Sequence, residues 1–123
     1  MTDTCAADAA TVLNFLATRP RLLGLGEPTH GEETLYDLRN ALVRDLVEQH
    51  GYRTVALETD CLAGLIVDDY VTGRGSLPLD EVMDRGFSHG WGGFPGNREL
   101  VRWMRAHNDG RPAAEQVRFA GFD

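Results

Sequence analysis

Short apolar runs alternate with longer amphipathic segments along the chain, and this alternation constrains the fold more than any other feature. Three runs are short and sharply bounded enough for buried strands: Arg21–Gly26, Arg53–Glu58 and Val117–Gly121. Apolar residues at helical spacing predict helices over Asp8–Thr18, His30–Gln49, Asp60–Val71, Leu79–Asp84 and Asn97–Asn108. The resulting order predicts an α/β fold, with a parallel sheet flanked by helices and joined by right-handed crossovers.

Local signals mark the ends of two predicted helices. Thr29 and Glu32 have the T-x-x-E spacing of a capping box, which predicts that the second helix begins at His30. Gly51 is suited to end that helix in a left-handed conformation. Asp60 is a suitable N-cap for the third helix.

The chain stops directly after its third predicted strand. Its 123 residues correspond to about one domain. A three-stranded parallel sheet without a helix after the last strand is thin, because parallel sheets are covered on both faces. We therefore expect residues 1–123 to be the N-terminal segment of a larger α/β domain.

Composition predicts a soluble globular protein of the cytoplasm. Hydrophobic residues make up 42% of the chain and charged residues 25%, and the formal net charge is −7. The negative charge argues against nucleic acid and anionic membranes as partners. Cys5 and Cys61 are isolated, which fits a reducing compartment without a disulfide framework. The acidic, polar N-terminus is no signal peptide, and the longest apolar run, Cys61–Val67, is too short to cross a membrane. The oligomeric state stays open.

Polar side chains follow each predicted strand at the edge where open parallel sheets bind ligands. Glu27 and His30 follow the first run, Glu58 follows the second, and Asp123 follows the third. An imidazole can accept a proton from water at neutral pH, and a nearby carboxylate can orient it and stabilise its cation. Arg39 interrupts the apolar stripe of the second predicted helix, so we expect it to pair with Glu27 or Glu58.

Other interpretations of these residues stay open. Glu27 and His30 are also typical turn and cap residues, and Arg39 could extend along its helix to solvent. Glu27, His30, Glu58 and Asp123 are chemically adequate metal ligands, although Glu-x-x-His alone is a weak metal pattern. His89 lies in a glycine–aromatic loop and could line a pocket with Trp91, or the loop could be packed simply by its aromatic rings.

Three common site types lack their sequence signals. There is no G-x-S-x-G motif, which disfavours a serine-triad hydrolase. The run beginning at Gly24 has Thr29 where a dinucleotide loop needs its third glycine, and the acidic Glu27 would repel a pyrophosphate. The same run lacks the Gly-Lys-Ser/Thr of a P-loop.

The motif Leu25-Gly-Glu-Pro-Thr-His-Gly31, with Arg39 and the run Gly51-Tyr-Arg-Thr-Val-Ala-Leu-Glu58, resembles the erythromycin esterase family. The stretch Trp103–Asn108 and the final Phe119–Asp123 are also similar to that family. The resemblance extends from about residue 20 to residue 123.

The resemblance implies hydrolysis of an ester or lactone, including the lactone of macrolide antibiotics, without a covalent intermediate, cofactor or required metal. His30 matches the general base of the family, which activates a water molecule, and Glu27, Arg39 and Glu58 match the polar residues around it. Family members are about three times longer, so a non-catalytic segment that binds a small molecule is the alternative, with a metal-dependent hydrolase as a further one.

Overall fold

The computed structural model describes residues 8–123, so the expectation for Cys5 lies outside the described residues. The chain divides into two compact units, an N-terminal unit over Met1–Gly51 and a C-terminal unit over Tyr52–Asp123. Each unit is described by itself below. Among the described residues, no helix is both long and apolar enough to cross a membrane.

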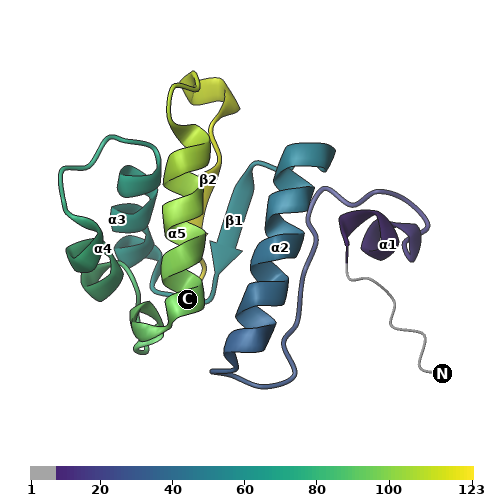
Figure 1. Ribbon diagram of the computed structural model, residues 1–123, viewed down its shortest axis with the longest axis horizontal. Coiled ribbons are helices and arrows are strands. Elements are labelled where there is room, and N and C mark those ends of the chain that lie inside the picture. The colour runs from purple at the N-terminus through teal and green to yellow at the C-terminus, as the bar shows by residue number, and fades with distance from the viewer. Residues whose placement is uncertain (1–7) are drawn as a thin grey trace. The chain divides into compact units, whose positions relative to one another are not determined.

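Residues 8–51 of the N-terminal unit form two helices, α1 (Ala9–Asn14) and α2 (Glu33–His50) (Figure 1). The Asp8 carboxylate accepts a hydrogen bond from the Thr11 N–H at 2.7 Å and so caps α1. Asp45 on α2 accepts from the Ala9 N–H at 2.9 Å, which fastens the first turn of α1 to α2. Helix α1 is shorter than predicted. It ends at Asn14, and the next residue, Phe15, is 80% exposed.

The predicted strand over Arg21–Gly26 does not form, and this prediction is wrong. The segment is irregular, with Leu22 86% exposed and Leu25 44% exposed. A strand needs a neighbour to satisfy its backbone N–H and C=O groups, and residues 8–51 contain no other strand. An apolar run is therefore not enough to predict a strand when no partner strand is available.

Helix α2 begins three residues later than the sequence predicts. Gly31 has φ = 78°, a left-handed conformation that a right-handed helix cannot continue through. The N-cap is therefore Glu32, whose carboxylate accepts from the Thr34 N–H at 3.4 Å, and Thr29 does not cap the helix. The predicted C-terminal end is confirmed, because Gly51 is left-handed with φ = 73°.

The C-terminal unit is a small α/β unit, which confirms the predicted fold class. Strands β1 (Thr54–Leu57) and β2 (Arg118–Gly121) pair in parallel, with Val55 beside Phe119 and Leu57 beside Gly121. Between them the chain forms helices α3 (Cys61–Val71), α4 (Leu79–Arg85) and α5 (Pro95–Asn108) and the short 3-10 turns η1 (Trp91–Gly93) and η2 (Ala113–Glu115) (Figure 1). The described sheet has two strands rather than three.

Helix α3 packs directly against β2. Asp60 caps the helix as predicted, accepting from the Ala63 N–H at 2.7 Å. Gly64 permits the close approach, because a Cβ atom at this position would lie 2.8 Å from the Gly121 backbone nitrogen. The core of the unit consists of fully or almost fully buried apolar side chains, namely Val67, Val71, Val82, Met83, Leu100, Val101, Met104, Val117 and Phe119.

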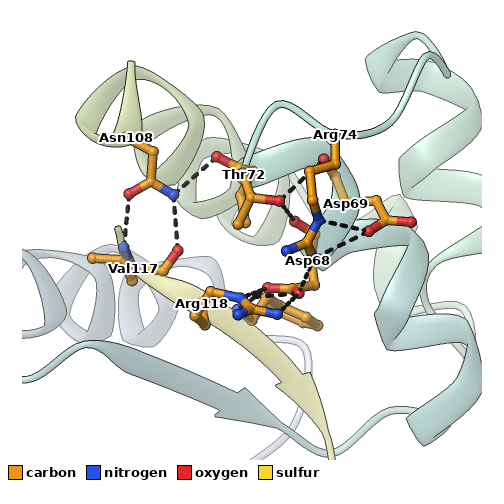
Figure 2. A network of polar contacts seen from close by, with 9 residues as sticks. Asp68, Asp69, Thr72, Arg74, Asn108, Val117 and Arg118 are labelled. Carbon is orange, nitrogen blue, oxygen red and sulfur yellow. Dashed lines mark hydrogen bonds and ion pairs between the residues drawn. The ribbon is translucent and has the colours of Figure 1, made fainter. Parts of the chain in front are cut away.

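A buried carboxylate joins α3 to β2 at the end opposite the polar strand exits (Figure 2). Asp68 is 2% exposed and accepts hydrogen bonds from the Arg118 guanidinium, from the Phe119 N–H at 3.0 Å and from Arg74 Nη2 at 2.8 Å. Burial alone would raise the pKa of Asp68. The hydrogen bonds from Arg118 and Phe119 and the two positive charges more than offset burial, so the pKa is lowered.

Asn108 makes the second polar junction of this unit (Figure 2). Its side chain is buried at the end of α5 and donates to the Val71 and Val117 carbonyl oxygens at 2.9 and 2.8 Å. Its Oδ1 accepts from the Val117 N–H at 2.7 Å. One amide thus satisfies backbone groups at the end of α3 and at the entrance to β2.

Candidate functional site

Glu27 and His30 lie together in the loop before α2. The Glu27 carboxylate is hydrogen-bonded to His30 Nδ1. The His30 side chain is 66% exposed and the Glu27 side chain 33% exposed, so the imidazole is the more accessible of the two. When Nδ1–H donates to Glu27, Nε2 carries the lone pair and can accept a proton from water.

Arg39 and Tyr36 continue this group on the first turns of α2. The Arg39 guanidinium donates to Asn40 Oδ1 at 2.9 and 3.2 Å and lies over the Tyr36 ring, 4.8 Å from its centroid. Burial lowers the pKa of Arg39, while the negative charge of Glu27 is close enough to favour the charged guanidinium. We call Glu27, His30, Tyr36 and Arg39 the loop cluster.

Tyr36 was not identified from the sequence, and it anchors the loop cluster. It is 4% exposed, and its hydroxyl accepts from the Gly31 N–H at 3.2 Å. The hydroxyl therefore holds the glycine that turns the chain from the His30 loop into α2. The available signal was its position three residues before Arg39, which places both side chains on one helix face.

Glu58 belongs to the C-terminal unit, whereas the loop cluster belongs to the N-terminal unit. It is exposed and sits in the bend directly after β1, as predicted for a residue at the strand exit. The next residue, Thr59, is fully buried, and its N–H donates to the Leu57 carbonyl oxygen at 2.9 Å. The chain thus turns sharply just where the Glu58 carboxylate leaves the strand.

Asp123 lies beside this turn, because the segment after β2 stays paired with the segment after β1. The Asp123 N–H donates to the Thr59 carbonyl oxygen at 3.0 Å, and its own carbonyl oxygen accepts from the Cys61 N–H at 3.2 Å. The Asp123 carboxylate is hydrogen-bonded to His89 Nε2 at 2.6 Å. Sequence reasoning noted His89 and Asp123 separately but did not pair them.

The loop that carries His89 is held to the same strand exit by Ser88. The Ser88 hydroxyl accepts from the Asp60 N–H at 2.8 Å and lies 3.2 Å from the Thr59 hydroxyl. The Ser88 N–H donates to the Thr59 hydroxyl at 2.8 Å. We call Glu58, Thr59, Ser88, His89 and Asp123 the strand-end cluster.

Glu27, His30, Glu58 and Asp123 are the side chains that the sequence offers as possible metal ligands. Among residues 8–123, no group of three or more His, Cys, Asp or Glu side chains is arranged to hold a metal ion. The histidine–carboxylate contacts that are present, Glu27 with His30 and Asp123 with His89, are pairs.

Comparison with known proteins identifies the family. A sequence profile of the erythromycin esterase family matches residues 47–123, which is more than half of the chain. The chain belongs to the erythromycin esterase family. An erythromycin esterase type II from Escherichia coli is 29% identical over 104 residues, and the alignment covers 84% of this chain. No solved structure matches the chain at a significant level.

The match to the family covers the two clusters unequally. Residues 47–123 include Glu58 and the whole strand-end cluster, whereas Glu27, His30 and Arg39 lie before the matched residues. The alignment with the Escherichia coli erythromycin esterase spans 23% of that protein, so the chain corresponds to about a quarter of its relative.

Proposed function

We propose that this chain is the N-terminal segment of a hydrolase that activates water for hydrolysis of an ester or lactone. Membership of the erythromycin esterase family supports this reaction class. The observation that carries the proposal is the hydrogen bond between Glu27 and His30 in a loop flanked by glycines. A macrolide lactone as the substrate, and the cytoplasm as the location, belong to the same proposal.

In this mechanism His30 is the general base. Glu27 fixes Nδ1–H, so Nε2 takes a proton from water as the water oxygen attacks the carbonyl carbon. Glu27 then faces the imidazolium and stabilises its charge. The resulting oxyanion collapses with cleavage of the C–O bond, and the departing alkoxide takes up a proton.

Arg39 supplies the positive charge for the oxyanion or organises the substrate pocket. Its contacts with Asn40 and Tyr36 hold the guanidinium on a rigid helix, as electrostatic stabilisation of a transition state requires. Glu58 enters the proposal through its place at the strand exit, within the residues that match the family. Its proposed role is to organise the polar groups at that strand exit.

The test is hydrolysis of erythromycin and of simple alkyl esters in 18O-labelled water, followed by mass spectrometry. Direct attack by water places one labelled oxygen in the carboxylate product. We expect His30→Ala to slow hydrolysis by roughly 100- to 10,000-fold, the usual contribution of general base catalysis. We expect Glu27→Gln to slow it less, because the amide still orients the imidazole without supporting its cation.

Two controls make this test specific. His50→Ala removes an imidazole from the far end of α2 and should leave the rate unchanged. Parallel assays with a chelator are informative because Glu27, His30 and Glu58 are also chemically adequate metal ligands. Hydrolysis at the wild-type rate by His30→Ala would refute the assignment of the base.

A further inference from the structure

Tyr36 is a buried tyrosine that contacts both sides of the loop cluster. The residue is 4% exposed. Its phenol oxygen accepts a hydrogen bond from the Gly31 N–H at 3.2 Å, and Arg39 Cζ lies over its ring, 4.8 Å from the centroid. One side chain therefore touches both the loop that carries the proposed base and the cation that is proposed to stabilise the oxyanion.

The loop before α2 has little packing of its own. Every residue from Gly24 to Gly31 is exposed, and a Cβ atom at Gly24 or Gly26 would have no atom within 4 Å. An exposed segment rich in glycine has many backbone conformations open to it. A hydrogen bond from Gly31 to a buried side chain narrows that choice. Because Gly31 directly follows His30, Tyr36 restrains the loop one residue away from the proposed base.

The Arg39 guanidinium is fixed by two buried neighbours on the same helix. Tyr36 lies three residues earlier, and the amide oxygen of Asn40, which is 5% exposed, accepts from the guanidinium at 2.9 and 3.2 Å. Burial lowers the pKa of Arg39, and the nearby charge of Glu27 partly opposes that shift. The cation is therefore close enough to interact with the carboxylate that orients His30.

We propose that Tyr36 is a positioning residue that sets the separation between the His30 imidazole and the Arg39 guanidinium. The phenol oxygen holds the loop at Gly31 while the ring holds the guanidinium, so both groups depend on one buried side chain of α2. Attack by water needs the base and the oxyanion stabiliser in place together, and a small displacement of either slows the reaction. Tyr36 itself transfers no proton. This inference rests on the proposed ester hydrolysis.

Replacing Tyr36 with phenylalanine removes the hydroxyl and keeps the ring beneath Arg39. With p-nitrophenyl butyrate as substrate, we expect kcat to fall about 10-fold and KM to change less than about twofold, because a buried side chain acts on the geometry of the base without binding the ester. Tyr70→Phe is the matched control. Tyr70 on α3 also has an arginine over its ring, with Arg105 Cζ 5.2 Å from the centroid, and its hydroxyl lies outside the loop cluster. We expect this control to keep the wild-type rate.

A double-mutant cycle shows whether the Tyr36 hydroxyl acts through His30. If it does, Tyr36→Phe lowers the rate about 10-fold when His30 is present and less than about twofold in the His30→Ala background. A general loss of structure would instead lower both rates by the same factor. The cycle thus separates positioning of the base from a merely structural role.

Nuclear magnetic resonance of the imidazole nitrogens gives a readout that is independent of turnover. In the wild-type protein, neutral His30 should carry its proton on Nδ1, the nitrogen that is hydrogen-bonded to Glu27. Tyr36→Phe should weaken this preference, because the released loop no longer holds the imidazole against the carboxylate. Tyr70→Phe should leave the preference unchanged.

The outcomes separate the two proposals. If the wild-type protein hydrolyses no ester, the proposed function fails and the catalytic consequence of Tyr36 fails with it. If the wild type is active and Tyr36→Phe leaves kcat unchanged, or lowers it equally with and without His30, the inference alone is wrong. An unchanged proton preference of His30 in Tyr36→Phe would also overturn it, whatever the rates.

Discussion

Replacing Asp68 with asparagine tests whether one buried carboxylate holds β2 against α3. The substitution keeps the size of the side chain and removes its charge. In the wild-type protein, the Asp68 carboxylate accepts hydrogen bonds from Arg118, from Arg74 and from the Phe119 N–H. An asparagine oxygen can still accept from Phe119, but its amide group cannot pair with the two guanidinium groups.

The size of the destabilisation depends on whether the side chains of Arg118 and Arg74 can be hydrated once the carboxylate is gone. Removing one partner of a fully buried ion pair costs about 3–5 kcal/mol, because the other charge is left buried. Here the Arg118 and Arg74 side chains are 49% and 53% exposed, so both can return to water. The remaining loss is that of charge-assisted hydrogen bonds, each about 1.5–3 kcal/mol before screening by solvent. We expect Asp68→Asn to destabilise the C-terminal unit by about 2–3 kcal/mol.

Urea unfolding followed by tryptophan fluorescence measures this loss, because Trp91 and Trp103 both lie in the C-terminal unit. Asp69→Asn is the matched control on the next residue of α3. Asp69 is 54% exposed and pairs with Arg74 at 3.2 Å, so its loss should cost less than about 1 kcal/mol. Equal destabilisation by the two substitutions would refute the reasoning.

Acid provides a second test of the same carboxylate. The pKa of Asp68 is lowered in the folded state, so its contribution to stability is complete above the ordinary aspartate value of about 3.9. That contribution is lost as the pH falls through the lowered folded value. The difference between wild type and Asp68→Asn should therefore shrink below about pH 4, and a constant difference there would contradict the assignment.

Two further substitutions probe the junctions of the C-terminal unit. Gly64→Ala should lower the free energy of unfolding in urea by about 1–3 kcal/mol, because the new Cβ would lie 2.8 Å from the Gly121 backbone nitrogen. Gly93→Ala is the control, because a Cβ atom there would have no atom within 4 Å. Asn108→Ala should cost about 3 kcal/mol by thermal unfolding, since it leaves the buried Val117 N–H and two carbonyl groups without their partner; a loss below about 1 kcal/mol would contradict this.

Helices were the most predictable part of this fold, since their signals are local. Asp60 caps α3 and Gly51 ends α2 as expected, because each acts on backbone groups within a few residues. The prediction of a strand at Arg21–Gly26 was wrong because a strand depends on a partner elsewhere in the chain. The start of α2 was wrong because the left-handed conformation of Gly31 outweighed the capping pattern of Thr29 and Glu32.

The polar contacts between helices and strands could not be predicted from the sequence, for the same physical reason. Asn108 looked like an ordinary residue at a helix end, and its three hydrogen bonds depend on where α3 and β2 arrive. Asp68 looked like one of two acidic residues late in α3. Its burial follows from the position of β2, fifty residues further along the chain, where Arg118 pairs with it.

The two histidine–carboxylate pairs show how this limit applies to a candidate site. Glu27 and His30 are three residues apart, so spacing alone suggested that they could meet, and they do. His89 and Asp123 are 34 residues apart, and they meet because the backbone after β2 stays paired with Thr59 and Cys61. The first pair could be proposed from the sequence, while the second needs the parallel register.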